Sequence, residues 1–110
     1  MAFNPDGHRL ATGSSDGMAR IWDATSGKQL TTVTHSDLAC SVAFGPDGRW
    51  LATASDDHTA RIWDTTSGQQ LVTVTHSDVV QGVAFSPDGR RLATASEDNT
   101  ARIWALSDDE

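Results

Sequence analysis

The stretch WLATASDDHTARIWD, residues 50–64, holds two strand-like runs joined by a short polar segment. In the second run, residues 59–64, the side chains alternate between two faces, with Ala60 and Ile62 on one of them. Alternation with a period of two is the pattern of a half-buried β-strand. The joining segment, Asp56-Asp57-His58, has the polar composition of a tight turn. We therefore predict that residues 50–64 form a β-hairpin.

This hairpin sequence recurs along the chain with a step of 41 residues. Trp22, Trp63 and Trp104 are separated by that step, and so are the three prolines of the sequence. Residues 2–42 and 43–83 are identical at 27 of 41 aligned positions. Chance does not produce such similarity, so the chain is a tandem repeat of one structural unit.

Each repeat contains further strand-like segments on both sides of the hairpin. Turns separate them, and Gly45-Pro46-Asp47-Gly48 is typical, because proline presets φ and glycine accepts a positive φ. No segment has helical periodicity of useful length. Four short strands in a period of about 40 residues match a blade of a β-propeller. The strands expected in the second repeat are Ser41–Phe44, Trp50–Ser55, Thr59–Asp64 and Gln69–Thr75.

Two short motifs connect these repeats with a known family. Ile21-Trp22-Asp23 and Ile62-Trp63-Asp64 resemble the Trp-Asp dipeptide that names the WD-repeat (WD40) family. Residues 85–89, followed by residues 92–96, look like the first turn and second strand of its repeat. The third copy departs from the pattern, because alanine and not aspartate follows Trp104. The resemblance covers essentially the whole chain. It implies an all-β fold, a partial β-propeller of about three four-stranded antiparallel blades.

The first and last blades are predicted to be incomplete. The first innermost strand is reduced to Met1-Ala2-Phe3, and the last blade lacks its outermost strand. We therefore expect a piece of a longer, bacterial-type repeat array. The expected division is blade 1 at about 1–35, blade 2 at about 36–76, blade 3 at about 77–106 and an acidic tail at 107–110.

The resemblance also implies a hydrogen-bond network in each blade, built from a His, a Ser or Thr, an Asp and a Trp. A buried indole N–H needs an acceptor, and a threonine hydroxyl can accept that bond and donate onward to histidine. We prefer Thr53 to Ser55 because hairpin pairing places Thr53 diagonally from Trp63 on the same face. Carried over by position, the network residues are His35, Thr53, Asp57 and Trp63 in the second copy, His76, Thr94, Asp98 and Trp104 in the third, and Thr12, Asp16 and Trp22 in the first, where the sequence supplies no histidine.

The copies differ from one another mostly in loops and at strand entries. Loops on a rigid scaffold often carry binding residues, and the resemblance implies partner binding at the ends of the propeller. Neutral drift at exposed loops is the alternative. Trp50 stands where the other copies have Arg9 and Arg91, so it is either an exposed interface residue or buried against the next blade. The candidate partner-binding residues are Leu38, Ala39, Trp50, Asp56, His58, Val79, Val80, Gln81, Glu97 and Asn99.

Catalytic, metal and cofactor sites are not expected. His35-Ser36-Asp37 and His76-Ser77-Asp78 place the three residue types of a hydrolase triad side by side. Adjacent residues on an extended loop point in different directions, however, and no motif supplies an oxyanion hole. Each repeat has one such histidine, without the close His or Cys pair of a metal site. No glycine-rich loop leads into a helix, so no phosphate cradle is expected.

Composition excludes other classes of partner. The net charge is −7 and the basic residues are scattered, apart from Arg90-Arg91, which argues against a nucleic-acid surface. No apolar run approaches the ~20 residues of a membrane span, and the N-terminal residues do not form a signal peptide. Cys40 is the single cysteine, so no intrachain disulfide can form. We expect a cytoplasmic protein.

Three functions remain at this point. The first is a non-catalytic protein–protein interaction scaffold whose partners the sequence does not identify. The second is a self-assembling segment that closes a ring by homo-oligomerisation without an outside ligand. A propeller buries each blade face against its neighbour, so two apolar faces would be open in a monomer. A hydrolase that uses the His/Ser/Asp loops is a distant third.

Overall fold

The computed structural model describes residues 1–106 of the chain. These residues form eleven β-strands, joined by turns and loops, and no helix. The acidic tail predicted at residues 107–110 lies outside the described residues. The first sheet comprises β1 (Ala2–Phe3), β2 (Arg9–Gly13), β3 (Met18–Asp23) and β4 (Gln29–Thr34). The second comprises β5 (Ala39–Phe44), β6 (Trp50–Ser55), β7 (Thr59–Asp64) and β8 (Gln70–Thr75). The third comprises β9 (Val80–Phe85), β10 (Arg91–Ser96) and β11 (Ala101–Ala105).

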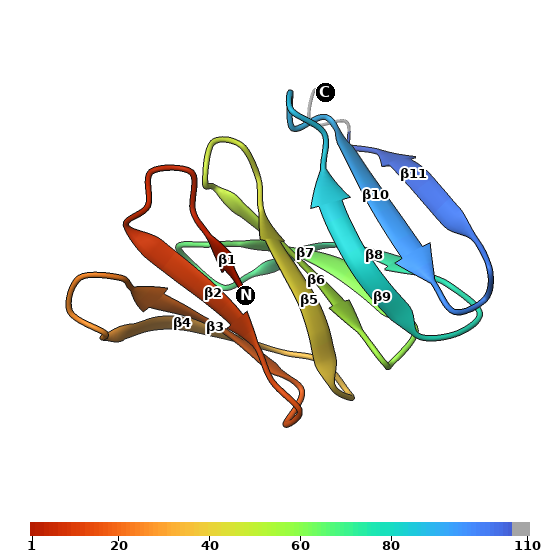
Figure 1. Cartoon of the computed structure of the whole chain (residues 1–110), viewed down its shortest axis with the longest axis horizontal. Coiled ribbons are helices and arrows are strands. Elements are labelled where there is room, and N and C mark those ends of the chain that lie inside the picture. Colours follow the sequence, from red (N-terminus) through yellow and green to blue (C-terminus); the bar gives the residue numbers. More distant parts are fainter. Residues whose placement is uncertain (107–110) are drawn as a thin grey trace.

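Each sheet is an antiparallel meander whose strands are hydrogen bonded in chain order. Figure 1 shows the three sheets following one another along the chain, with β5 between the first sheet and β9. The prediction of an all-β partial propeller is confirmed, and so are its two incomplete blades. The first sheet begins with a strand of two residues, and the third has three strands among the described residues.

The turn between the two hairpin strands contains a residue with a positive φ in every copy. Its third residue lies in the left-handed region, with φ of 86° at Gly17, 75° at His58 and 71° at Asn99. Glycine adopts this conformation without steric cost, and asparagine and histidine tolerate it better than most other residues. His58 and Asn99 therefore carry a side chain in the left-handed conformation, whereas Gly17, at the same position of the first copy, carries none.

Apolar side chains fill the space between consecutive sheets. We call the side of each sheet that carries Ile21, Ile62 or Ile103 its isoleucine face, and the opposite side its tryptophan face. The isoleucine face of the first sheet packs on the tryptophan face of the second, and that of the second packs on the third. The first junction buries Ala11, Ala19, Ile21 and Val33 against Val42, Leu51 and Trp63. The second buries Ala52 and Ile62 against Leu92, with Val83, Phe85 and Trp104 packed around them.

Candidate functional site

Antiparallel pairing brings five loop segments to one end of the sheets. Ala39, at the start of β5, pairs with Ser55, at the end of β6, and Thr59 pairs with Thr75 in the same way. The loop before each innermost strand therefore lies beside the β2–β3, β6–β7 or β10–β11 turn. We call this the histidine end; it comprises residues 14–17, 35–38, 56–58, 76–79 and 97–99.

In the second sheet, the structure brings together the four side chains that the resemblance implies. Trp63 Nε1–H donates to Thr53 Oγ1 over 2.9 Å. His35 Nε2 contacts the same hydroxyl, and His35 Nδ1 lies 3.0 Å from Asp57 Oδ2. The chain of bonds is complete if Thr53 O–H donates to Nε2 and Nδ1–H donates to Asp57, which requires a neutral imidazole. The imidazole edge also contacts the Trp63 ring, with centroids 5.9 Å apart.

Strand register explains why Thr53 occupies this position and Ser55 does not. Trp63 pairs directly with Leu51, and Thr53 pairs with Arg61, so Thr53 lies diagonally from Trp63 on the tryptophan face. Thr53 is fully buried. Its hydroxyl is therefore shielded from water and satisfied within the sheet.

The third sheet repeats the arrangement, and the first has part of it. His76 Nδ1 lies 3.0 Å from Asp98 Oδ2, and His76 Nε2 lies 2.7 Å from Thr94 Oγ1. Trp104 Nε1–H donates to the same hydroxyl over 2.9 Å. In the first sheet, the described bonds are Trp22 Nε1–H to Thr12 Oγ1, over 3.0 Å, and the Arg20–Asp16 ion pair.

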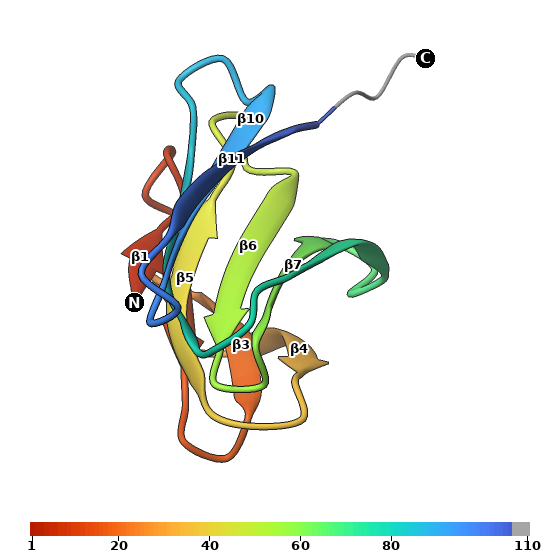
Figure 2. The same cartoon turned by 90° about the vertical axis from the view of Figure 1, so that its right-hand side faces the viewer.

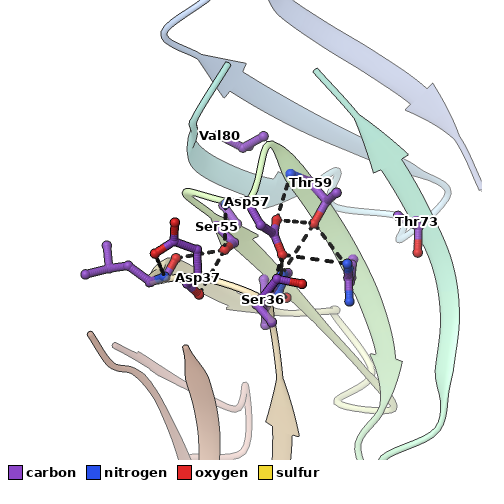
Figure 3. Close-up of polar contacts among 12 residues, drawn as sticks. Ser36, Asp37, Ser55, Asp57, Thr59, Thr73 and Val80 are labelled. Atoms are coloured by element: carbon purple, nitrogen blue, oxygen red, sulfur yellow. Dashed lines mark hydrogen bonds and ion pairs between the residues drawn. The ribbon is translucent and has the colours of Figure 1, made fainter. Parts of the chain in front are cut away.

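Two further residues in each of the second and third sheets join the network, and the sequence reasoning missed them. Thr59 Oγ1–H donates to Asp57 over 2.5 Å, and Ser55 Oγ accepts from the Asp57 N–H over 3.1 Å. Ser55 Oγ–H donates to Leu38 O over 2.8 Å, which ties the loop before β5 to the turn after β6. Figure 3 shows Asp57 between Ser36, Ser55 and Thr59. Ser55 and Thr59 recur 41 positions later as Ser96 and Thr100, and this recurrence was the sequence signal that could have identified them.

The network shifts the pKa values of its titratable groups. Burial lowers the pKa of His35, and this effect outweighs the attraction of Asp57. Burial alone would raise the pKa of Asp57, but hydrogen bonds from Thr59, His35 and Ser36 lower it to about 2. The hydrogen bond from Thr100 contributes most to holding the pKa of Asp98 well below its usual range. Neutral pH therefore favours a neutral His35 and an ionised Asp57.

Acid is expected to destabilise the fold in two steps. His35 and Asp57 have lower pKa values folded than unfolded, so the unfolded chain binds protons more readily and stability falls as the pH drops. The His35 contribution weakens below pH ~6.5, and the Asp57 contribution is lost between pH ~4 and ~2. We expect Asp57 to account for about 1 kcal/mol after solvent screening. Urea denaturation at several pH values measures this.

The matched variants are Asp57→Asn and the neighbouring Asp56→Asn. Asp57→Asn removes the charge that accepts from His35 and Ser36, so the dependence of stability on pH should flatten between pH ~4 and ~2. Asp56→Asn leaves those bonds in place and should keep the wild-type dependence. An undiminished acid response in Asp57→Asn would show that this carboxylate is not its source.

The structure distributes the candidate partner-binding residues unevenly. His58, Gln81, Glu97 and Asn99 are exposed, and Leu38, Asp56 and Val79 are half-buried, so this group lies at or near the surface of the histidine end. Ala39 and Val80 are buried at 4% and 0% exposure, and the prediction that they contact a partner is corrected. They sit at the first residues of β5 and β9, where the innermost strands pack against neighbouring sheets.

Trp50 belongs to a different part of the molecule. It lies at the opposite end of β6, where it is half-buried and packs with the core cluster of Ile62 and Leu92. Its ring centroid is 6.5 Å from that of Phe85 on the next sheet. Of the two alternatives for Trp50, the structure therefore supports burial against the next blade.

The contacts of the side chains at the histidine end favour a structural role for them over a catalytic one. His35 makes its side-chain contacts with Asp57 and Thr53, not with the adjacent Ser36 and Asp37. The Thr53 hydroxyl is fully buried and bonded to Trp63, so it cannot reach a substrate. Within residues 1–106, no group of three or more His, Cys, Asp or Glu side chains could hold a metal ion. The same residues form no helix of the length and apolarity that crossing a membrane requires.

Sequence comparison agrees with this geometry. The model of the family described as "WD domain, G-beta repeat" matches residues 1–23, 27–64 and 68–105. The second matched segment begins just before β4 and ends with β7, so the family's repeat unit is offset by one strand from the sheet. The chain is also similar to an uncharacterized WD repeat-containing protein, alr3466, of Nostoc sp. (strain PCC 7120), at 53% identity over 32 residues. That alignment covers 29% of this chain and 2% of the relative's length. Three sheets with repeated His–Thr–Asp–Trp networks and matches along nearly the whole sequence place this chain in the WD40 repeat family.

Proposed function

We propose that this chain is a non-catalytic scaffold that binds another protein at its histidine end. Domains of the WD40 family are generally protein-interaction scaffolds and typically lack catalytic activity. Binding by such a domain requires side chains that point into solvent from loops of fixed geometry. The histidine end combines both properties.

The carrying observation is the conformation of His58 and Asn99. Both side chains are exposed, and both backbones lie in the left-handed region that Gly17 occupies in the first copy. A non-glycine residue in this conformation costs about 1 kcal/mol, a cost often found at functional sites. The turns beneath them are fixed by Asp57 and Asp98, which bond to the buried histidines. A rigid base thus presents two different side chains at equivalent positions.

Charge indicates the kind of partner. Asp37, Asp56, Asp78 and Glu97 all lie at the histidine end, in none of the ion pairs among the described residues. Of the three arginines at matching positions on β3, β7 and β11, Arg20 and Arg61 pair with the aspartates of their own turns, and Arg102 is exposed and in none of the ion pairs that residues 1–106 form. Complementary potentials steer association, so we expect the partner surface to be basic.

A selection from a displayed random-peptide library on the immobilised chain tests this function. We expect the selected peptides to be basic and to lose at least about tenfold in affinity for the double variant His58→Gly/Asn99→Gly, a change of roughly 1.4 kcal/mol. Glycine removes both side chains and relieves the backbone conformation, as Gly17 does in the first copy. Weaker binding by this variant therefore cannot be attributed to unfolding.

Thr66→Ala is the matched control, because Thr66 is exposed on a turn at the other end of the sheets. Peptides that bind the histidine end should bind this variant as tightly as the wild type. A selection that yields no binders, or only binders indifferent to the double glycine variant, would contradict the proposed function.

A further inference from the structure

The end of the sheets opposite the histidine end carries the β1–β2, β5–β6 and β9–β10 turns, each of which contains one of the three prolines. Figure 2 shows the β5–β6 and β9–β10 turns close together at the top of the view. Between these two turns the surface has a hollow of about 240 Å³, lined among others by Gly45, Trp50 and Leu106. The second and third sheets enclose this hollow together, so it belongs to a junction inside the chain.

The corresponding place at the first junction is occupied by polar side chains. Asn4 is 7% exposed, and a Cβ added to Gly48 would lie 2.6 Å from Asn4 Oδ1. Arg9 Nη1, from the first sheet, lies 3.5 Å from Thr65 Oγ1 of the second sheet. Side chains from both sheets therefore meet across the first junction at this end.

Three substitutions between the repeats change this place at the second junction. Asn4, Arg9 and Thr65 are replaced, 41 positions later, by Gly45, Trp50 and Leu106. Glycine has no side chain to fill the space, and tryptophan and leucine do not reproduce the polar contact. Trp50 packs with Phe85 of the third sheet, and Leu106 is 9% exposed. The differences between two otherwise similar repeats thus produce a hollow with apolar groups in its lining.

Two arginines also line the hollow, one from each of the two sheets. Arg49 and Arg90 are exposed, and neither side chain takes part in the ion pairs found in the part of the chain that the structure describes. Asp47 and Asp88 line the hollow as well, but each carboxylate accepts from the backbone N–H two residues later, over 3.0 and 2.9 Å. The two guanidinium groups are therefore available to a ligand.

We infer that this hollow binds a short acidic segment of another protein, with an apolar side chain against Trp50 and Leu106 and a carboxylate between Arg49 and Arg90. A guanidinium group can hold a carboxylate through two parallel hydrogen bonds. The volume of about 240 Å³ is smaller than the roughly 300–1,000 Å³ of small-molecule sites, which favours a peptide side chain over a cofactor. The inference does not depend on the proposed function, because that function uses the histidine end.

A selection from a displayed random-peptide library on the immobilised variant His58→Gly/Asn99→Gly tests this site, because that variant lacks two exposed side chains of the histidine end. We expect peptides that combine Asp or Glu with an apolar residue. Adding Arg49→Gln and Arg90→Gln removes both charges and should lower their affinity at least about tenfold. Both arginines are exposed, so circular dichroism and unfolding should be unchanged.

Gly45→Asn in the same background tests the hollow itself, because it introduces the residue that the first copy has there. Gly45 has no positive φ, and a Cβ on it would meet its nearest atom, Trp50 Cβ, at 3.6 Å, which is an ordinary contact. The variant should therefore fold normally, keep both arginines, and lose at least about tenfold in affinity for the selected peptides.

Arg91→Gln is the matched control for the loss of charge. Arg91 is exposed and adjacent to Arg90, but it does not line the hollow, so this variant should bind the peptides as its parent does. A selection without acidic binders overturns the inference, and so do acidic binders that tolerate Gly45→Asn or the double arginine change. Neither result alters the separate test of the histidine end.

Discussion

Replacing Trp63 with alanine is expected to lower the free energy of unfolding by about 3–5 kcal/mol. Trp63 is 6% exposed at the first junction, where it packs with Ile21 and Val42. The substitution leaves a cavity between two sheets and removes the donor that holds the Thr53 hydroxyl. A domain of this size has roughly 5–15 kcal/mol of total stability, so the loss approaches complete unfolding. Denaturant titration followed by circular dichroism measures it.

The first copy provides the matched control for this substitution. Trp22 makes the same bond to its threonine, but it lies half-buried on the open tryptophan face. Trp22→Ala should therefore cost about 1–2 kcal/mol, because Trp22 buries less apolar area in the folded chain than Trp63 does, and its removal loses less of the hydrophobic stabilisation. Equal losses for the two variants would contradict the assignment of Trp63 to a buried junction and of Trp22 to the half-buried tryptophan face of the first sheet.

Thr53→Val is expected to cost about 2–4 kcal/mol although it preserves the shape of the side chain. The hydroxyl of Thr53 accepts from Trp63 and contacts His35 Nε2. Valine leaves both partners without a hydrogen bond in a place that water does not reach. Each unsatisfied buried group costs about 1–3 kcal/mol, and the two penalties add in part. Thermal and urea unfolding of the variant would both show the loss.

Thr12→Val is the corresponding change in the first copy. Thr12 and Trp22 are half-buried, and no histidine among the described residues contacts this hydroxyl. We expect a loss of less than about 1 kcal/mol, since water can replace the missing bond to Trp22. If Thr53→Val proved as mild as Thr12→Val, the His–Thr–Asp–Trp network would not be a major source of stability.

Periodicity predicts the strands well because each strand is a local pattern repeated by the 41-residue step. β6 and β7 have the bounds expected from the sequence. β5 begins at Ala39 and not at Ser41, because a bulge between these residues lets the strand continue to pair with Ser55. A bulge interrupts the alternation of faces, so a search for alternation begins the strand too late in the sequence.

The burial of single loop residues could not be predicted in the same way. Ala39 and Val80 vary between copies, as surface residues do, yet contacts with neighbouring sheets cover them. Trp50 is likewise covered by Phe85 from the following repeat. These contacts depend on how one sheet is placed against the next, and a pattern within a single repeat carries no information about that placement.

The one-directional stacking of the sheets has a consequence for cooperativity. Each sheet gains stability from its own strands and from contacts with the sheets beside it, as in other repeat proteins. Of the three described sheets, the middle one has both faces covered, whereas the outer two have one each. Opening of β9–β11 or of β1–β4 sacrifices one junction, and opening of β5–β8 sacrifices two. We therefore expect a single chain to open sheet by sheet, with partly unfolded forms of increasing free energy. The backbone amides of β5–β8 should be the last to exchange with solvent.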